Sequence, residues 1–313
     1  MLNPIKLIFT SFFILSLGLV SGCPSRLEVD RSETTRQSPV DQTNQNVSPQ
    51  CVDSEFNIQF LQTDNQGNPK REGANYVIIF NPRSKDLDFK VSVALNHSLY
   101  AKNAQGKLKK EYVPKQFDEI ISDENARLNG KLPIAAINAD YIDTEDKPQG
   151  LNISRGVEYS GAFKNKRSSF GISGGRPENR KATIQIGKRE DPVLNYNLVG
   201  GNGRFYRQGQ FKDICPELGA YACQQETSRS MVGITKKGYV ILLVNNSHGE
   251  QTLYPNMFDD VLEGIAKNYC LGKIQEGMLF DGGYSTALYY NNRTYVQNFN
   301  PIGSVFLIYK KQP

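Results

Sequence analysis

The sequence predicts an α+β fold in which residues 51–313 form a single domain around a mixed β-sheet with a few flanking helices. Three observations support this prediction. Short apolar runs recur along this part of the chain, and two longer segments have the apolar spacing of helices. Neither a second linker nor an internal repeat divides it. Helices that alternate irregularly with many strands are typical of this class.

The first 50 residues are of a different kind. Residues 1–22 resemble a bacterial lipoprotein signal peptide, because Lys6 precedes an apolar stretch too short to span a membrane comfortably, which then ends in Val-Ser-Gly-Cys. Cys23 would then carry the lipid, palmitate included, and anchor the protein to a membrane of the bacterial cell envelope, facing the periplasm or the exterior. An ordinary secretory signal with a chance cysteine is the alternative.

Residues 23–50, from the lipidated cysteine onward, are expected to form a disordered tether. Sizeable apolar residues are rare there among many serines, threonines, glutamines, asparagines and charges. Such a segment buries too little apolar surface to offset the entropy of ordering the chain.

The apolar runs predict strands because each is short and rich in β-branched or aromatic residues. They are Tyr76–Phe80, Phe89–Leu95, Ile134–Asn138, Met231–Ile234, Tyr239–Val244, Met278–Asp281, Thr286–Tyr290 and Ser304–Tyr309.

Two segments have helical spacing instead. Pro114–Leu128 begins with proline, places apolar residues on one face and stops before Gly130. Asp259–Leu271 gathers its apolar residues on one side, with Gly272 as the stop.

With Cys23 lipidated, an even number of cysteines remains, which favours disulfides in an exported chain. Cys215 and Cys223 flank a short loop that one bridge would close, leaving Cys51 to pair with Cys270, although sequence alone does not fix the pairing. A metal site is not expected, since the chain has no Cys-x-x-Cys and only two histidines. A divalent cation near the acidic loop that follows residue 138 stays open, and no other cofactor is expected.

The segment Leu279–Tyr290 is the most informative of the sequence. An apolar strand leads into Asp281, and Gly282 and Gly283 follow, then Ser285 before the next strand. Glycines beside a carboxylate permit a sharp turn and the close approach of a ligand. The alternative is a tight hairpin in which Asp281 only accepts hydrogen bonds from the turn.

A second group of polar residues follows the strand that ends at Asn138. We expect Asn138 and Asp140 to be functional because they lie closest to the strand, whereas the acidic residues 143–146 are expected to form a solvated turn. Residues Gly200, Gly201 and Gly203 are expected to form a flexible loop, either near substrate or as a plain hairpin.

Arg229 enters an apolar strand, where a lone buried charge is too costly, so it must pair or face a ligand. A guanidinium suits bidentate phosphate binding, and a salt bridge to Glu226 is the alternative. His248, in a Ser-His-Gly turn after a strand, is a further candidate for the site, whereas His97 is expected in a plain turn. The formal net charge is +5, without the basic and aromatic clusters typical of nucleic-acid binding.

Together the motifs INADYID, PQGLNISRG, LVGG, SRSMVGITKKGYVILLV and MLFDGGYSTALYY resemble, in order and spacing, the phosphodiester glycosidase family over residues 75–310. The resemblance implies a hydrolase that cleaves a sugar-1-phosphate linkage in a cell-surface or exopolysaccharide glycan. It also implies a set of residues lining the site: Asn138, Gly150, Arg229, Asp281, Gly282, Gly283 and Ser285. The chain departs from the family's usual glycines at Ala139, Asp140 and Tyr284.

We assign roles from chemistry, because carboxylates stabilise an oxocarbenium-like transition state and transfer protons. Asp281 is expected to be the main catalytic carboxylate, Asp140 its partner and Arg229 the phosphate clamp. Asn138 and Ser285 would hold sugar hydroxyls or phosphate oxygens.

Two other functions remain open. Gly283–Ala287 superficially resembles the nucleophile elbow of serine hydrolases, but both histidines precede Ser285, whereas in that fold the histidine follows. The stronger alternative is a non-catalytic, surface glycan-binding lipoprotein on the same scaffold, because a fold does not fix a function.

Overall fold

The computed structural model describes residues 50–52, 57–95, 112–160, 167–219, 223–246 and 249–311. The predicted signal peptide, Cys23, almost all of the predicted tether, His97 and His248 lie outside these residues. The described residues belong to one compact unit that extends over residues 46–313.

The first sheet has seven strands in the order β1-β2-β13-β12-β14-β10-β11. Their bounds are β1 Ile58–Thr63, β2 Asn75–Phe80, β10 Asn202–Arg207, β11 Gln210–Phe211, β12 Arg229–Thr235, β13 Val240–Asn245 and β14 Ile274–Leu279. The central strands β2, β13, β12 and β14 were predicted from their apolar runs.

Two further sheets have five strands each. The second has the order β16-β15-β4-β17-β3, and the third β6-β5-β9-β7-β8. The strands of the second are β3 Leu87–Val93, β4 Ala135–Asn138, β15 Leu288–Tyr290, β16 Arg293–Val296 and β17 Ser304–Lys310. Those of the third are β5 Asn152–Ser154, β6 Val157–Ser160, β7 Ser168–Ile172, β8 Ala182–Ile186 and β9 Asn197–Gly200.

The fold is therefore mainly β, and the prediction of one mixed sheet was wrong. Every strand pair in the three described sheets is antiparallel. The two predicted helical segments cover sheet faces. The apolar runs of the sequence arise because the main strands are buried on both faces. Such burial is more common in parallel sheets than in antiparallel ones.

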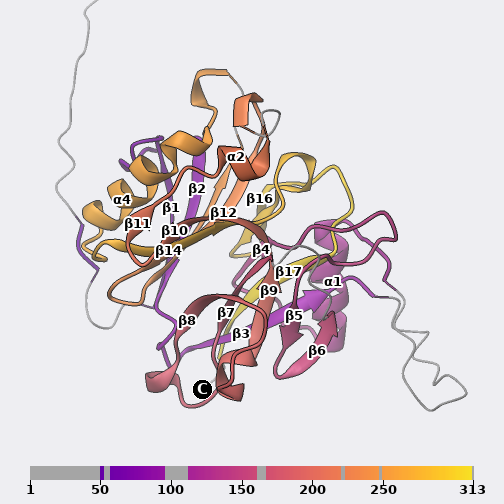
Figure 1. Cartoon of the computed structure of the whole chain (residues 1–313). Helices are drawn as coiled ribbons and strands as arrows, with labels where there is room; N and C mark the ends of the chain where they lie inside the picture. The colour runs from indigo at the N-terminus through magenta and orange to yellow at the C-terminus, as the bar shows by residue number, and fades with distance from the viewer. Residues whose placement is uncertain are drawn as a thin grey trace, which may run out of the picture. The chain divides into compact units, whose positions relative to one another are not determined.

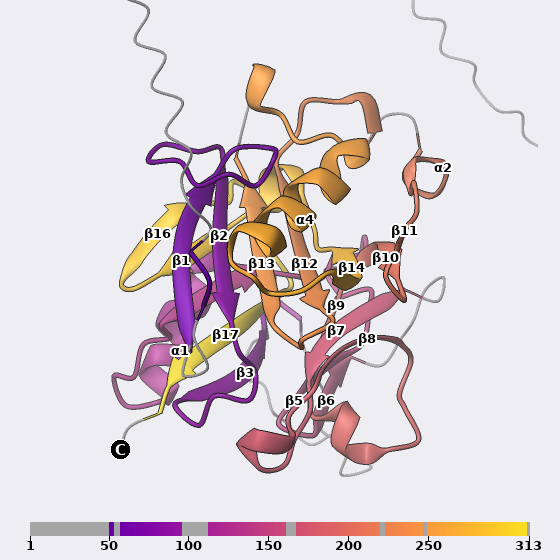
Figure 2. The ribbon, with the colours of Figure 1, turned by 90° about the vertical axis from the view of Figure 1, so that its left-hand side faces the viewer.

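The core lies in layers that follow the alternation of side chains along each strand. In β2, Ile78 and Phe80 join the central core between the three sheets, whereas Val77 and Ile79 face α4 Phe258–Asn268 on the other side. Figure 2 shows α4 in front of β12 and β13. In the same way, helix α1 Phe117–Arg127 packs on the outer face of β17 (Figure 1).

The remaining helical elements are short and lie in connections. They are α2 Cys215–Leu218 and the 3-10 turns η2 Pro177–Asn179, η3 Pro192–Asn195, η4 Gly249–Gln251, η5 Pro255–Met257 and η6 Gly283–Ser285. Within the described ranges, no helix combines the length and the apolar character needed to cross a bilayer.

Both predicted cysteine pairs lie at bonding distance. Cys215 bonds to Cys223 across the short loop, and Cys51 bonds to Cys270, just after α4. The second bridge joins positions 219 residues apart and so ties the start of the folded unit to the segment that follows α4. Disulfides persist in oxidising compartments, so the two bridges indicate an extracytoplasmic protein.

Candidate active site

The candidate site lies where the strand ends of all three sheets meet. The chain leaving β14 is joined to the chain leaving β4, because the Asp281 N–H donates to the carbonyl of Ala139 (2.7 Å). It is joined to β12 as well, through the Phe280 N–H and the carbonyl of Ser230 (2.9 Å). These bonds place the two predicted catalytic carboxylates at one junction of the fold.

Asn138 holds this junction together. Its side chain is fully buried, and its Nδ2 donates to the carbonyl of Asp281 (2.6 Å). Its Oδ1 accepts from the hydroxyl of Ser230 (2.7 Å) and the N–H of Ala287 (3.0 Å). Sequence reasoning assigned Asn138 to substrate, but its geometry is that of a residue that positions the loop carrying Asp281.

Asp140 is enclosed by protein and only 1% exposed. Its Oδ2 accepts from the N–H of Gly150 (2.7 Å) and from Nδ2 of Asn152 on β5 (2.7 Å). Gly200, at the end of β9, packs so closely that a Cβ there would lie 2.4 Å from the same oxygen. Gly150, predicted to line the site, therefore contacts Asp140 through its backbone.

The surroundings of Asp140 favour its protonated form. Burial raises the pKa of its carboxyl from 3.8 to about 7, although the bonds from Asn152 and Gly150 and the charge of Arg167 oppose the rise. Its Oδ1 is buried and has no hydrogen-bond partner among the described residues. With this pKa the carboxyl keeps its proton at mildly acidic pH and is partly protonated at neutral pH.

Asp281 differs because it reaches a cleft. The cleft has a volume of about 680 Å³, and Tyr141, Asp281, Gly282 and Ser285 are among the residues that line it. Burial raises the pKa of Asp281 from 3.8 to about 6, against the lowering effect of hydrogen bonds from the Ser285 side chain and the Gly282 backbone. Predicted from sequence to be the main catalytic carboxylate, Asp281 thus lies within reach of a ligand.

Each of the two positions after Asp281 requires glycine for its own steric reason. A Cβ on Gly282 would lie 2.9 Å from the carbonyl oxygen of Ser228, so no side chain fits there. Gly283 has a φ of +60°, in the left-handed region, and its N–H donates to the same carbonyl (2.8 Å). The glycines let the catalytic loop lie flat against the start of β12.

Arg229 lies at that start, 6% exposed. Burial lowers the pKa of its guanidinium, and Tyr141 and Tyr254 are near enough to interact with it electrostatically and counter this effect. Arg229 is therefore a buried cation close to Tyr141.

Sequence reasoning missed Arg167 and Tyr141, which link these groups. The Arg167 guanidinium lies over the Tyr141 ring, 4.9 Å from its centroid, and its charge lowers the pKa of Asp140, Asp281 and Tyr141. The Tyr141 hydroxyl donates to the carbonyl of Phe280 (3.0 Å). A signal for Arg167 was present, because Arg-Ser-Ser-Phe-Gly-Ile at β7 repeats the pattern of Arg-Ser-Met-Val-Gly-Ile at β12.

The glycines at 200, 201 and 203 do not form the flexible loop that was expected. Gly200 ends β9, and Gly203 lies within β10, so one residue separates the two strands. A Cβ on Gly201 would lie 2.2 Å from the Met278 side chain, so this connection is tightly packed beside Asp140. These glycines permit close packing of backbone and carboxylate.

The acidic residues 143–146 form the turn that was expected of them. Asp143 Oδ1 accepts the N–H groups of Glu145 (2.9 Å) and Lys147 (3.0 Å). Among the described residues, no three acidic, histidine or cysteine side chains are grouped in a way that would hold a metal ion.

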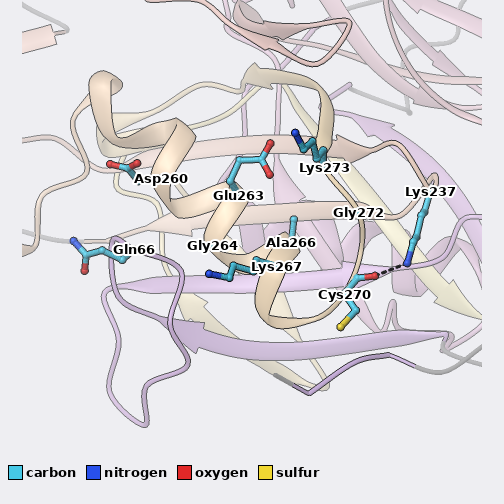
Figure 3. Close-up of a pocket in the computed structure, with 10 residues that line it drawn as sticks. All are labelled: Gln66, Lys237, Asp260, Glu263, Gly264, Ala266, Lys267, Cys270, Gly272 and Lys273. Atoms are coloured by element: carbon cyan, nitrogen blue, oxygen red, sulfur yellow. Dashed lines mark hydrogen bonds between the residues drawn. The ribbon is translucent and has the colours of Figure 1, made fainter. Parts of the chain in front are cut away.

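A larger cavity of about 840 Å³ lies apart from the carboxylates, beside α4 (Figure 3). Its lining mixes Lys237, Lys267 and Lys273 with Asp260 and Glu263, and the Lys237 ammonium donates to the carbonyl of Cys270 (2.9 Å). None of the residues predicted to line the active site lines this cavity, although the disulfide residue Cys270 does.

Two solved structures share the fold. The catalytic domain of zebrafish N-acetylglucosamine-1-phosphodiester alpha-N-acetylglucosaminidase, auto-inhibited by its pro-peptide, matches with a TM-score of 0.56 and 14% identity over 84% of this chain and 86% of that one. A hypothetical protein from Synechocystis matches with a TM-score of 0.52 and 14% identity over 81% of this chain. The chain spans only 61% of the Synechocystis protein. At such identities the likeness concerns the fold alone.

A search of curated proteins finds no matching sequence. The sequence profile of the phosphodiester glycosidase family matches residues 132–309. This range is more than half of the chain, and it contains Asp140, Arg167, Arg229 and Asp281. The chain therefore belongs to the phosphodiester glycosidase family.

Proposed function

We propose that the protein is a hydrolase that cleaves a glycosyl phosphodiester in a cell-surface or exopolysaccharide glycan, while anchored to a membrane of the cell envelope through lipid on Cys23. The observation that carries the proposal is Asp281. This carboxyl lines a cleft, has a pKa of about 6, and lies near Arg167, whose charge also acts on Asp140.

Hydrolysis of a sugar-1-phosphate diester breaks the bond between the anomeric carbon and the phosphate oxygen. Water supplies the new oxygen and one proton, and the phosphate leaves as a monoester. Positive charge develops on the sugar in the transition state, and a carboxylate beside it lowers the barrier. Asp281 serves this role in its ionised form, which predominates above about pH 6.

Asp140 acts differently in this proposal. Because Gly150, Asn152 and Gly200 surround its carboxyl, substrate does not reach it. It faces the charge of Arg167, so we assign it a positioning role instead of the direct catalytic one expected from sequence.

The phosphate requires positive charge from the protein. Arg229 and Arg167 both act on Tyr141, which lines the cleft together with Asp281. Two guanidinium groups near one cleft-lining residue would offer the donors that a phosphodiester needs. The phosphate is then held next to the carboxylate that acts on the sugar.

The test compares purified wild-type protein with Asp281→Asn on glycosyl-1-phosphate diesters, measuring release of the phosphate monoester. We expect the variant to remain folded and to lose roughly 10²–10⁴-fold in kcat, as is usual when an acid–base group is removed. Wild-type kcat/KM should rise as the pH increases through about 6. Asp260→Asn, an exposed position on α4, is the matched control.

Activity of Asp281→Asn within about threefold of wild type would remove this residue from the catalytic role. Wild-type protein that binds glycans yet releases no phosphate monoester would support the non-catalytic, glycan-binding alternative.

A further inference from the structure

Two aromatic side chains stand exposed beside the catalytic loop. Phe299 is 77% exposed and Tyr284 is 69% exposed, the highest fractions among the large hydrophobic side chains that the structure describes. Their rings meet edge to face, with centroids 6.0 Å apart and an interplanar angle of 90°. Adjacent exposed aromatic rings are unusual on a protein surface and mark a contact site.

The backbone holds this pair in place. The carbonyl of Tyr284 accepts the N–H groups of Phe299 (2.8 Å) and Asn300 (3.1 Å). Asn298, next to Phe299, accepts the N–H of Phe117 at the start of α1 (3.1 Å). The aromatic rings are therefore presented on anchored backbone, which lowers the entropy lost when a ligand binds.

Beside the rings lies a pocket of about 320 Å³, near the lower end of the range of roughly 300–1,000 Å³ usual for small-ligand sites. Apart from the two aromatic residues, its lining is mostly polar and includes Gln225, Thr227, Asn246 and Gln297. Among the described residues that line it, none is a lysine or arginine, and Glu226 is the only acid. This lining suits a neutral ligand with many hydroxyls.

The pocket adjoins the catalytic cleft. Gly282 lines the cleft and Gly283 the pocket, and in the second segment Asn300 lines the cleft and Phe299 the pocket. A ligand that passes over residues 282–284 would thus contact both.

We propose that this pocket binds a neutral pyranose unit of the substrate, next to the sugar or phosphate group held by Asp281 and the arginines. The apolar C–H face of a pyranose packs against the electron-rich face of an aromatic ring, and amide side chains bond its hydroxyls. The preferred substrate is then an oligosaccharide or a polymer. The position given to this sugar rests on the proposed function.

The first experiment uses two glycosyl phosphodiesters with the same scissile sugar, one bearing a methyl group on the phosphate and the other a tetrasaccharide. We expect Tyr284→Ala and Phe299→Ala to lower kcat/KM for the extended substrate about tenfold more than for the short one, mainly through KM. Tyr284→Phe keeps the ring and should behave as wild type. Val193→Ala, an exposed apolar residue of η3, is the matched control.

The second experiment needs no turnover. Neutral tetrasaccharides of glucose, N-acetylglucosamine and galactose are titrated calorimetrically into Asp281→Asn and into Asp281→Asn with Tyr284→Ala. Binding of at least one tetrasaccharide, weakened about tenfold by the loss of the ring, supports the subsite even if no phosphodiester is hydrolysed. Two results would overturn the subsite. One is that Tyr284→Ala hydrolyses both substrates with equal losses in kcat/KM relative to wild type. The other is that none of the tetrasaccharides binds to Asp281→Asn.

Discussion

Asp140 and Asp281 lie at one junction of the fold, yet their surroundings give them different tasks. Asp281 reaches the cleft, whereas Asp140 is enclosed by two glycines and an asparagine. The sequence predicted both as site residues because each follows an apolar strand. It did not separate their roles, since the enclosing residues 150, 152 and 200 are remote in the chain.

Asp140→Asn should remove part of the pH dependence of stability. Because the native pKa is about 7, against 3.8 ordinarily, the folded protein keeps a proton that the unfolded chain releases. The retained proton stabilises the folded protein, and this contribution to the free energy of unfolding is fully present below about pH 4. It is lost as the pH rises through about 7 and totals roughly 4 kcal/mol. The amide cannot ionise, so the variant should exceed wild type in stability at about pH 8.

Urea unfolding of both proteins at about pH 5 and about pH 8 measures this difference. Asp260→Asn should show the same change in unfolding free energy between the two pH values as wild type. If Asp140→Asn also shows the wild-type change in unfolding free energy, the pH dependence comes from other groups, Asp281 included.

The two arginines make a second test at the residue scale. Lysine keeps the charge but loses the forked donor geometry, so Arg229→Lys and Arg167→Lys should impair a phosphodiester much more than a neutral aryl glycoside of the same sugar. The measurement is the ratio of the two losses in kcat/KM. Arg180→Lys is the control, because Arg180 is a buried arginine whose Nη1 donates to the backbone carbonyl of Leu87 (2.8 Å) and which does not line the cleft.

Equal losses on both substrates, accompanied by a lower melting temperature, would assign Arg229 to a structural ion pair instead, the alternative that its sequence position left open.

At the scale of elements, strands with apolar runs were predictable and polar strands were not. The runs at β2, β4, β12, β13 and β17 match the expected segments within a few residues. The third sheet was missed almost entirely, because strands such as β5 Asn152–Ser154 and β6 Val157–Ser160 are short and partly polar. β5 and β6 pair with each other across a short turn, but β5 joins the rest of the sheet through the distant strand β9, a pairing that no local pattern records.

Gly200→Ala tests whether this unpredicted sheet supports the site. The added Cβ would lie 2.4 Å from Asp140 Oδ2, so either β9 or the carboxyl must move. Overpacking of this kind costs typically about 1–3 kcal/mol. We expect a lower melting temperature and a loss of kcat/KM that persists where the variant is fully folded.

Gly233→Ala on β12 is the matched control. Its Cβ would meet side-chain methyl groups, Leu262 at 3.2 Å and Ile274 at 3.8 Å, and none of its nearest atoms belongs to Asp140. It should affect stability more than activity. A Gly200→Ala protein with full activity would show that the position of Asp140 does not matter for turnover.

For the whole molecule, the disulfides were predictable by counting and the sheet arrangement was not. Four cysteines remain after Cys23, and the short loop between 215 and 223 selects one pair and leaves the other. The meeting of three antiparallel sheets depends on contacts between segments far apart in the chain, such as Ser230 with Asn138, which are 92 residues apart. Site residues could be predicted because they follow apolar strands, but their arrangement in space could not.

The lipid anchor remains a prediction at this scale. Cys23→Ser should release the protein from the membrane fraction and leave the folded unit and its hydrolysis of soluble substrates unchanged. Fractionation of cells followed by immunoblotting measures the release. Substituted protein that stays in the membrane fraction would contradict anchoring through this cysteine.

The place of β17 in the second sheet governs when the fold can form. It lies between β3 and β4, so until residue 310 has been synthesised β3 has no partner in this sheet and β4, the strand leading to Asp140, has only β15. A growing chain therefore lacks this sheet and its buried carboxyl until late in translation. Late completion of this sheet disfavours folding during synthesis, which suits a protein whose two disulfides indicate an extracytoplasmic location.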